Sequence, residues 1–189
     1  MFAPRETMVG TGAQSTCECL AAPLAEMLDE LRRVVCGLED HEYTRPMGPV
    51  FLDATIGGHV RHCLDHVRAI TEGLSAGAID YDHRERGTSI ERSAAAAAAE
   101  CESLAASLRA LMPVEAARGV RVSVIPRRDG EPVALGSTLA RELAFVLSHT
   151  VHHNAMIRGM ATSLGRPLPG AFGYAPSTLA HQDATACAR

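Results

Sequence analysis

Histidines in two short runs carry the clearest chemical signal in this chain. Six of the nine histidines lie in the segments Gly58–His66 and Ser148–Asn154, and they are His59, His62, His66, His149, His152 and His153. Neutral imidazole is the commonest protein ligand for a divalent transition metal. Two histidines four residues apart on a helix point the same way, so one ion can bind both. The sequence therefore predicts a metal held between two helices.

The helical geometry of the second run favours two of its histidines. At about 100° per residue, His153 lies about 40° from His149, and both fall in the middle of an apolar stripe, with His152 at its edge. Two imidazoles in a buried stripe need partners for their ring nitrogens, and a metal serves both. In the first run the same wheel favours His59 and His66 slightly over His62, and this choice stays open on geometry alone. His41, His83 and His181 are expected in loops.

Composition narrows the class of protein. A chain of 189 residues with 47% apolar side chains is long enough to bury a core and is not a disordered chain. A net charge of −4 gives no basic field, so we expect no nucleic-acid partner and no anionic membrane surface. The first residues show no apolar run typical of an export signal, so we expect none, and no apolar run is long enough to span a bilayer. The six scattered cysteines then indicate reduced thiols and a cytoplasmic location.

Apolar residues recur at helical spacing in four segments. The first lies within residues 16–39, and Pro23 suggests a start near Ala21 or Ala22. The second runs from about Asp53 or Thr55 to Gly73, and its Gly57 and Gly58 suggest a close approach of another segment to the backbone. In the third, Thr88 and Glu91 suggest a capping box, and the helix continues to about Met112, where Pro113 ends it. The fourth starts at Ser137 or Thr138 and ends near Leu164, before Gly165.

The remaining segments are connections or short strands. Residues 77–87 read as a polar loop, and residues 119–135 alternate in a way that predicts a β-hairpin around Asp129-Gly130. We therefore expect an all-α protein, a four-helix bundle with a small β-hairpin insert between its third and fourth helices. The expected division is an irregular or disordered segment over 1–15, the bundle over 16–164, and an irregular tail over 165–189. Phe172, Tyr174 and Leu179 are expected to pack that tail on the bundle.

These features together resemble the DinB/YfiT-like superfamily of metal-binding four-helix bundles. The resemblance extends from the first helix to Leu164, and its strongest marks are Thr55–His66 and His149–Asn154. Members typically carry one histidine about seven residues after a helix-starting Ser or Thr, and an HxxxH pair on the last helix. The resemblance therefore implies a metal site formed by His62, His149 and His153, with His59 or His66 as alternatives to the first. Many members have Arg after the last ligand, where this chain has Asn154.

The resemblance also implies an activity. Three neutral imidazoles leave open positions on the ion, as catalytic sites do, and imidazole suits zinc, nickel or iron. Characterised relatives include metal-dependent transferases of low-molecular-weight thiols and a thiol-using maleylpyruvate isomerase. We therefore expect a divalent-metal-dependent enzyme that activates a small thiol or water for transfer to, or hydrolysis of, a small-molecule substrate. Asp65 could orient a ligand, act as a base or face solvent, and Arg61 and Arg84 could anchor a carboxylated cofactor or lie on a solvated face.

Two other functions compete with this interpretation. A non-catalytic, metal-stabilised dimer or stress-linked binding protein would have a closed site, with His59 or His66 as a fourth ligand. Damage-inducible relatives suggest nucleic-acid binding, but the acidic balance opposes it. Bundles of this kind often pair through a helix face, so we expect a homodimer.

Overall fold

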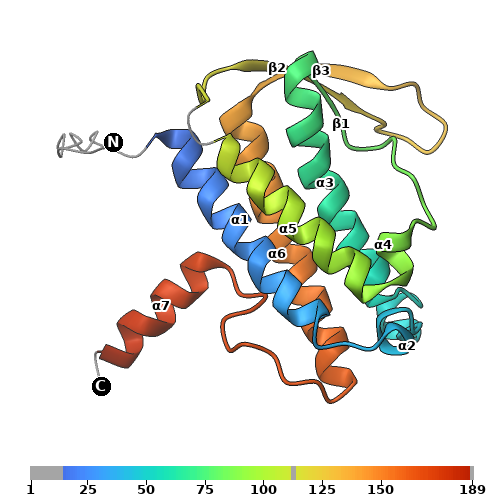
Figure 1. The fold of residues 1–189 in the computed structure, drawn as a ribbon. Coiled ribbons are helices and arrows are strands. Elements are labelled where there is room, and N and C mark those ends of the chain that lie inside the picture. Colours follow the sequence, from blue (N-terminus) through green and yellow to red (C-terminus); the bar gives the residue numbers. More distant parts are fainter. Residues whose placement is uncertain (1–14, 112–113, 188–189) are drawn as a thin grey trace.

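Helices make up most of the protein. The computed structural model describes residues 15–111 and 114–187 (Figure 1). In these ranges the α-helices are α1 (Thr16–Val35), α2 (Asp40–Tyr43), α3 (Ile56–Ala76), α4 (Ser89–Arg92), α5 (Ala94–Ala110), α6 (Leu139–Ser163) and α7 (Pro176–Cys187). One 3₁₀ helix and three strands complete the elements: η1 (Pro49–Phe51), β1 (Ala78–Asp80), β2 (Gly119–Val124) and β3 (Val133–Thr138).

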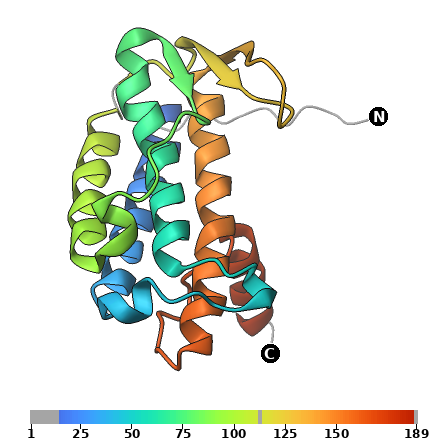
Figure 2. The ribbon, with the colours of Figure 1, turned by 90° about the vertical axis from the view of Figure 1, so that its right-hand side faces the viewer.

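The four long helices pack side by side. Helix α1 packs on α5 and α6, and α3 packs on the same two helices. The sheet covers one end of these helices, while α2 and η1 lie at the other (Figures 1 and 2). The expected mainly helical class is confirmed. Within the ranges that the structure describes, no helix has both the length and the apolar character needed to cross a bilayer.

The helix ends agree with the capping signals in two of the four segments. The Thr55 hydroxyl accepts from Gly58 N at 2.9 Å and begins α3, which continues three residues past the expected end and stops at Gly77 with φ +66°. Thr138 caps α6 in the same way, and Gly165 follows that helix with φ +71°. A hydroxyl that accepts from the first turn is the usual start of a helix, and a left-handed glycine after the last turn is the usual end.

Helix α1 starts earlier than Pro23 suggests. Ser15 is the N-cap, and its Oγ accepts from Glu18 N at 3.0 Å. The start expected near Ala21 or Ala22 is therefore wrong. Cys17 and Ala21 are fully buried, so the packing of the first two turns outweighs the cost of a proline inside the helix, about 3 kcal/mol.

The third predicted helix is broken in two. Thr88 is the N-cap of α4 but its side chain makes no capping bond, so the predicted capping box is wrong. The chain breaks at Ser93, whose Oγ caps α5 by accepting from Ala96 N. Distant contacts determine the break, because Asp40 Oδ1 accepts from Ala94 N at 2.8 Å and Tyr43 Oη donates to Ile90 O at 2.8 Å. Helix α5 ends at Ala110, and Met112 and Pro113 lie outside the described residues.

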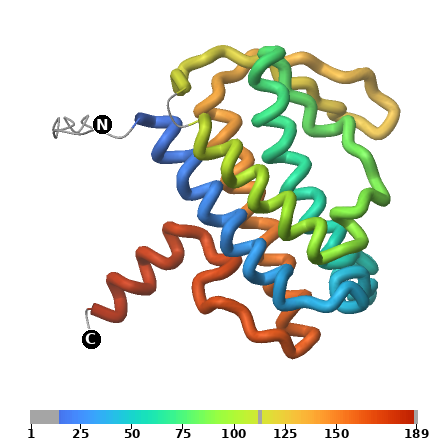
Figure 3. The backbone as a smooth tube through the Cα atoms, viewed as in Figure 1, coloured from blue at the N-terminus to red at the C-terminus, as the bar shows by residue number. Residues whose placement is uncertain are grey.

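The predicted hairpin is part of a larger sheet. Strands β2 and β3 pair antiparallel, with Val124 opposite Val133. Strand β1 lies within the segment predicted to be a polar loop, and that prediction is wrong for residues 78–80. The strand pairs parallel with β2. The pairing buries Ile79, which is 1% exposed. After β1 the chain runs along α3 from the sheet to α4, at the opposite end (Figures 1 and 3).

The C-terminal segment is only partly irregular. Phe172 is fully buried in the core, and Arg158 Nη1 donates to its carbonyl at 2.8 Å. Residues 176–187, expected as irregular, form α7. That helix has no buried residue and extends away from the long helices in Figure 1, so the tail is attached through Phe172 rather than through α7.

Gly57 is where two segments approach most closely at the start of α3. A Cβ placed there would lie 2.3 Å from Glu91 O and 2.8 Å from Tyr43 Cε1, whereas at Gly58 the nearest atom, Thr55 Oγ1, is at 3.3 Å. The close approach predicted from this glycine pair is therefore confirmed at Gly57. The absence of a side chain there lets α4 pack on α3.

We predict that Gly57→Ala destabilises the protein and Gly58→Ala does not. Overpacking against a backbone carbonyl should lower the free energy of unfolding by at least about 2 kcal/mol. For Gly58→Ala, the better helix propensity offsets the tighter contact, and the change should stay within about 1 kcal/mol. Urea denaturation of both variants measures the difference. Equal stabilities would show that α4 does not pack on the Gly57 backbone in solution.

Candidate metal centre

The contact between α3 and α6 brings the two histidine runs together. His62 lies on α3, and His149 and His153 lie one turn apart on α6. Because these two helices pack directly on each other, side chains on their facing sides meet at short range. The expected trio therefore lies on two adjacent helices, and each of these helices begins with a threonine N-cap.

Nitrogen atoms of the three rings lie close to one another. One nitrogen from each of His62, His149 and His153 lies within 4.8 Å of the other two. Nε2 of His62 is 2.9 Å from Nε2 of His149. Two nitrogens at the usual Zn–N distance of about 2.1 Å are about 3.0–3.4 Å apart when they share an ion. Small movements of the side chains are thus enough to place all three on one metal.

His59 and His66 surround the trio without joining it. His59 Nδ1 is 2.8 Å from His153 Nδ1, so one of these two rings donates to the other. His66 Nδ1 donates to the His62 carbonyl at 2.9 Å, and its ring stacks on His149 at 4.1 Å between centroids. Both alternatives to His62 therefore lie beside the group of candidate ligands rather than in it.

The remaining four histidines lie outside this cluster. His152 is exposed on α6, and His83 is exposed after β1, where its Nδ1 contacts Asp80 Oδ2 at 2.7 Å. His41 and His181, expected in loops, lie instead on the helices α2 and α7.

Burial keeps the clustered imidazoles neutral. Burial, followed by the neighbouring imidazoles, lowers the pKa of His62 to about 2, of His153 to about 3 and of His149 to about 4. The pKa values of His59 and His66 are also lowered, mainly by burial. At neutral pH each ring therefore keeps a nitrogen lone pair, which is the form that binds a metal.

Asp65 is tied to arginines and not to the histidines. Its carboxylate accepts from Arg61 Nη1 at 2.6 Å and from Arg68 Nη1 at 2.9 Å. Arg68 also pairs with Glu100 at 2.7 Å, and Arg61 Nε lies 3.2 Å from Glu91 Oε2 without the angle of a hydrogen bond. Asp65 is only 8% exposed, so the solvent-facing alternative is wrong. The ion pair with Asp65 also engages the guanidinium of Arg61.

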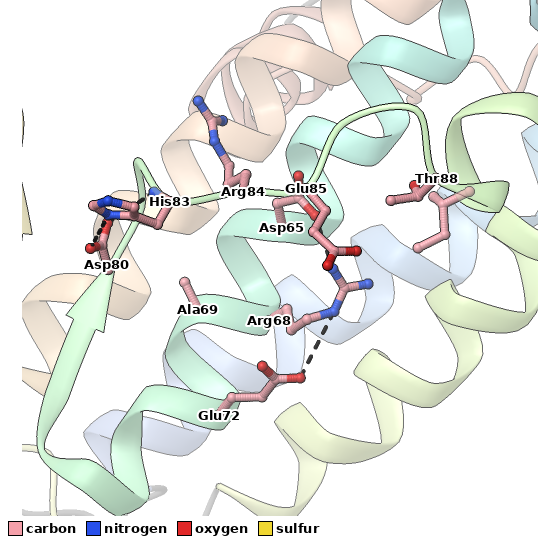
Figure 4. A pocket seen from close by; sticks show the side chains of 10 residues that line it. Asp65, Arg68, Ala69, Glu72, Asp80, His83, Arg84, Glu85 and Thr88 are labelled. Carbon is pink, nitrogen blue, oxygen red and sulfur yellow. Dashed lines mark hydrogen bonds and ion pairs between the residues drawn. The ribbon is translucent and has the colours of Figure 1, made fainter.

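Arg84 reaches the histidines from the segment after β1. Its Nη1 contacts His62 Nδ1. It also lines a cavity of about 440 Å³ between α3 and residues 80–90, whose walls include Asp65, Arg68 and Glu72. In Figure 4 the Arg84 side chain leaves its segment on the side away from Arg68 and Glu72. Arg84 thus separates the cavity from the histidine cluster.

Sequence reasoning missed a polar wall beside the cluster. Tyr81 stacks on His66 at 5.1 Å between ring centroids, and its hydroxyl donates to Glu142 Oε2 at 2.8 Å. Ser137 Oγ donates to the other oxygen of Glu142 at 2.5 Å, and Phe145 packs between Tyr81 and His149. Burial, followed by the bond to Glu142, raises the pKa of Tyr81. The alternation of Ile79 and Tyr81 was the available signal for this wall.

We predict that the metal-free protein loses stability as the pH falls below about 6.5. An unfolded histidine binds a proton near that pH, whereas the clustered histidines resist protonation, so acid favours the unfolded state. The free energy of unfolding should be level above pH 7.5 and fall between pH 6.5 and 5. His62→Gln should reduce this slope by about 1.4 kcal/mol per pH unit, the contribution of one proton.

Urea denaturation at a series of pH values, with a chelator present, measures the slope. His181→Gln, a change in an exposed side chain of α7, is the matched control and should keep the slope of the unmodified protein. A slope that is the same in all three proteins would contradict the burial of the clustered imidazoles.

Comparisons with known proteins identify a family. A stretch of 59 residues is 37% identical to FK506-binding protein 5 of Rhizopus delemar, and it covers 31% of this chain and 15% of that protein. No solved structure matches the chain. The family model of the DinB superfamily matches residues 23–157, a range that contains His62, His149 and His153. The chain therefore belongs to the DinB superfamily.

Proposed function

We propose that this protein is a divalent-metal-dependent enzyme of the DinB-like type, in which His62, His149 and His153 hold the ion on a four-helix bundle. The observation that carries the proposal is the position of three neutral imidazole nitrogens, from two helices, within 4.8 Å of one another. Imidazole ligands suit zinc, nickel or iron. Members of the superfamily bind divalent metals, which supports the same assignment.

The composition of the site supports a catalytic role over a structural one. Structural zinc sites use four protein ligands, whereas catalytic sites use three and leave a position open. Among the described residues, the group of nitrogens within 4.8 Å of one another comes from three histidines and includes neither His59 nor His66, the two candidates for a fourth ligand. This favours the enzyme over a non-catalytic, metal-stabilised dimer or a stress-linked binding protein.

The chain's own residues would orient and shield the reacting groups. A divalent ion bound here lowers the pKa of a coordinated water or thiol, which provides a nucleophile at neutral pH. His66 holds its Nδ1 hydrogen on the His62 carbonyl, so Nε2 is its acceptor nitrogen beside the cluster. Tyr81 and Phe145 cover one side of the rings and keep water from that side.

The finer features of this function stay predictions. These are the low-molecular-weight thiol as a second cofactor, a small-molecule substrate, transfer or hydrolysis as the reaction, a homodimer and a cytoplasmic location. The division into an N-terminal segment, a bundle over 16–164 and a C-terminal tail is likewise proposed.

We predict that protein purified without an affinity tag contains a divalent transition metal that depends on the trio. His149→Ala and His153→Ala each remove one of three ligands and should lower the bound metal at least tenfold in elemental analysis after dialysis. His152→Ala changes an exposed side chain on the same helix and should keep the metal content of the unmodified protein. Metal retained in full by both ligand variants would remove the proposed site.

We predict that the metal-loaded protein accelerates conjugation of a small thiol to a model electrophile. The rate should exceed that of the metal-stripped protein and of His153→Ala, because only the loaded site can lower the pKa of a bound thiol. Mass spectrometry of the conjugate over time measures the rate. A loaded protein that is no faster than the stripped one, with either a thiol or water as nucleophile, would favour the non-catalytic alternative.

A further inference from the structure

A second cavity, of about 320 Å³, lies between the sheet and the start of α6. Its walls are largely apolar or aromatic, and they include Tyr81, Val122, Val124, Leu135 and Phe145. The volume is within the usual size of small-molecule sites, which are concave and lined mainly by apolar and aromatic side chains. The cavity therefore has both the size and the lining of a ligand site.

The register of the sheet turns the aliphatic walls toward one face. Leu135 lies directly opposite Val122 in the antiparallel pair, and directly opposite residues share a face of the sheet. Val122 is only 5% exposed, whereas Leu135 is 50% exposed at the edge of the cavity. An apolar group in the cavity would remove this part of Leu135 from water, and that burial is favourable.

The polar groups of the cavity favour an uncharged ligand. Both oxygens of the buried Glu142 carboxylate accept hydrogen bonds, from Tyr81 Oη at 2.8 Å and from Ser137 Oγ at 2.5 Å. An anion would be repelled by this carboxylate, and a cation would find its oxygens already engaged. Arg141 also lines the cavity, but its side chain is exposed and solvated. A charged group would thus lose its hydration without gaining a buried partner.

The inner wall of the cavity is shared with the histidine cluster. The Tyr81 ring stacks on His66 at 5.1 Å between centroids, and the Phe145 ring lies 5.7 Å from that of His149. The two aromatic rings are 5.3 Å apart and both line the cavity. The cavity is therefore separated from the candidate ligand His149 by a single aromatic side chain.

We propose that this cavity binds an uncharged apolar group of the substrate, aromatic or branched aliphatic, beside the metal centre. The inference rests on the proposed function and adds the class of substrate, an electrophile that carries such a group close to its reactive carbon. The apolar walls would supply affinity and selectivity, while the histidine cluster would supply the chemistry.

The first experiment measures binding without activity. N-phenylnaphthylamine is an uncharged dye whose fluorescence rises in apolar surroundings, and it should bind the unmodified protein saturably, with or without metal. Leu135→Glu places a charge at the edge of the cavity and should weaken dye binding at least about tenfold. The matched control is Val133→Glu on the same strand, because Val133 is 44% exposed and lies outside the cavity walls. It should bind the dye as the unmodified protein does.

Two further variants keep this test decisive. If Leu135→Glu lowers the free energy of unfolding, Leu135→Ser and Val133→Ser replace the glutamate pair with the same expectations. Leu52→Ser changes a side chain that is 91% exposed at the opposite end of the long helices and should not affect the dye. Absence of saturable binding, equal loss in the Leu135 and Val133 variants, or loss in Leu52→Ser would each overturn the inference.

The second experiment compares two electrophiles with the metal-loaded protein and a small thiol. N-benzylacrylamide should be conjugated with a kcat/KM at least about tenfold higher than that of N-methylacrylamide, each corrected for its rate without protein, because only the benzyl group fills the cavity. Leu135→Glu should lose this preference and Val133→Glu should keep it. Equal kcat/KM values, in a protein that conjugates both compounds, overturn this inference alone. Dye binding that depends on Leu135, without metal-dependent conjugation of either compound, overturns the proposed function and leaves the cavity as an apolar binding site.

Discussion

The packing of five neutral imidazoles against one another at the contact between α3 and α6 constrains the rest of this structure. Five imidazoles meet there, and each neutral ring requires a partner for its lone pair as well as for its N–H. They satisfy this requirement mostly among themselves: His59 with His153, His62 with His149, and His66 with a carbonyl. Three of these rings, His62, His149 and His153, place nitrogens within 4.8 Å of one another, so their lone pairs could serve one cation.

The carboxylates near these rings are also bound to partners of their own. The Asp65 carboxylate, which could have supplied an acceptor or a charge, is held by Arg61 and Arg68. The carboxylate of Glu142 is likewise occupied, by Tyr81 and Ser137. The centre is therefore a neutral pocket bordered by compensated charges, and Arg84 is the cation nearest to it that lacks an ion pair among the described residues.

The parts of the fold that could be predicted from the sequence are those with a local cause. Thr55 and Thr138 as caps, Gly165 as a stop, and the His149 and His153 pair all follow from spacing on a single helix. The helical wheel ranked His62 below His59 and His66, because it measures direction toward the centre of the apolar stripe. Helix α3 packs on both α5 and α6, however, and His62 lies on the side of the stripe that faces α6. Only the family resemblance selected it.

Features with distant causes could not be predicted in this way. The break at Ser93 depends on Asp40 and Tyr43, and strand β1 depends on its pairing with β2. Arg84 lies in a charged segment, and the sequence of that segment does not indicate that one of its side chains turns toward the histidines. Local patterns contain no information about such partners, so the residues that surround the candidate ligands could be identified only from the three-dimensional structure.

The parallel pairing of β1 with β2 has a consequence for how this protein could diversify. Parallel neighbours require a crossover, and here the crossover carries residues 81–92 along α3 between two anchored ends. The helices that carry the imidazoles and the segment that carries Arg84 are thus separate parts of the chain. Insertions or exchanges within residues 81–92 can change the side chains that border the histidine cluster, while the candidate ligands and the helices that bear them stay as they are.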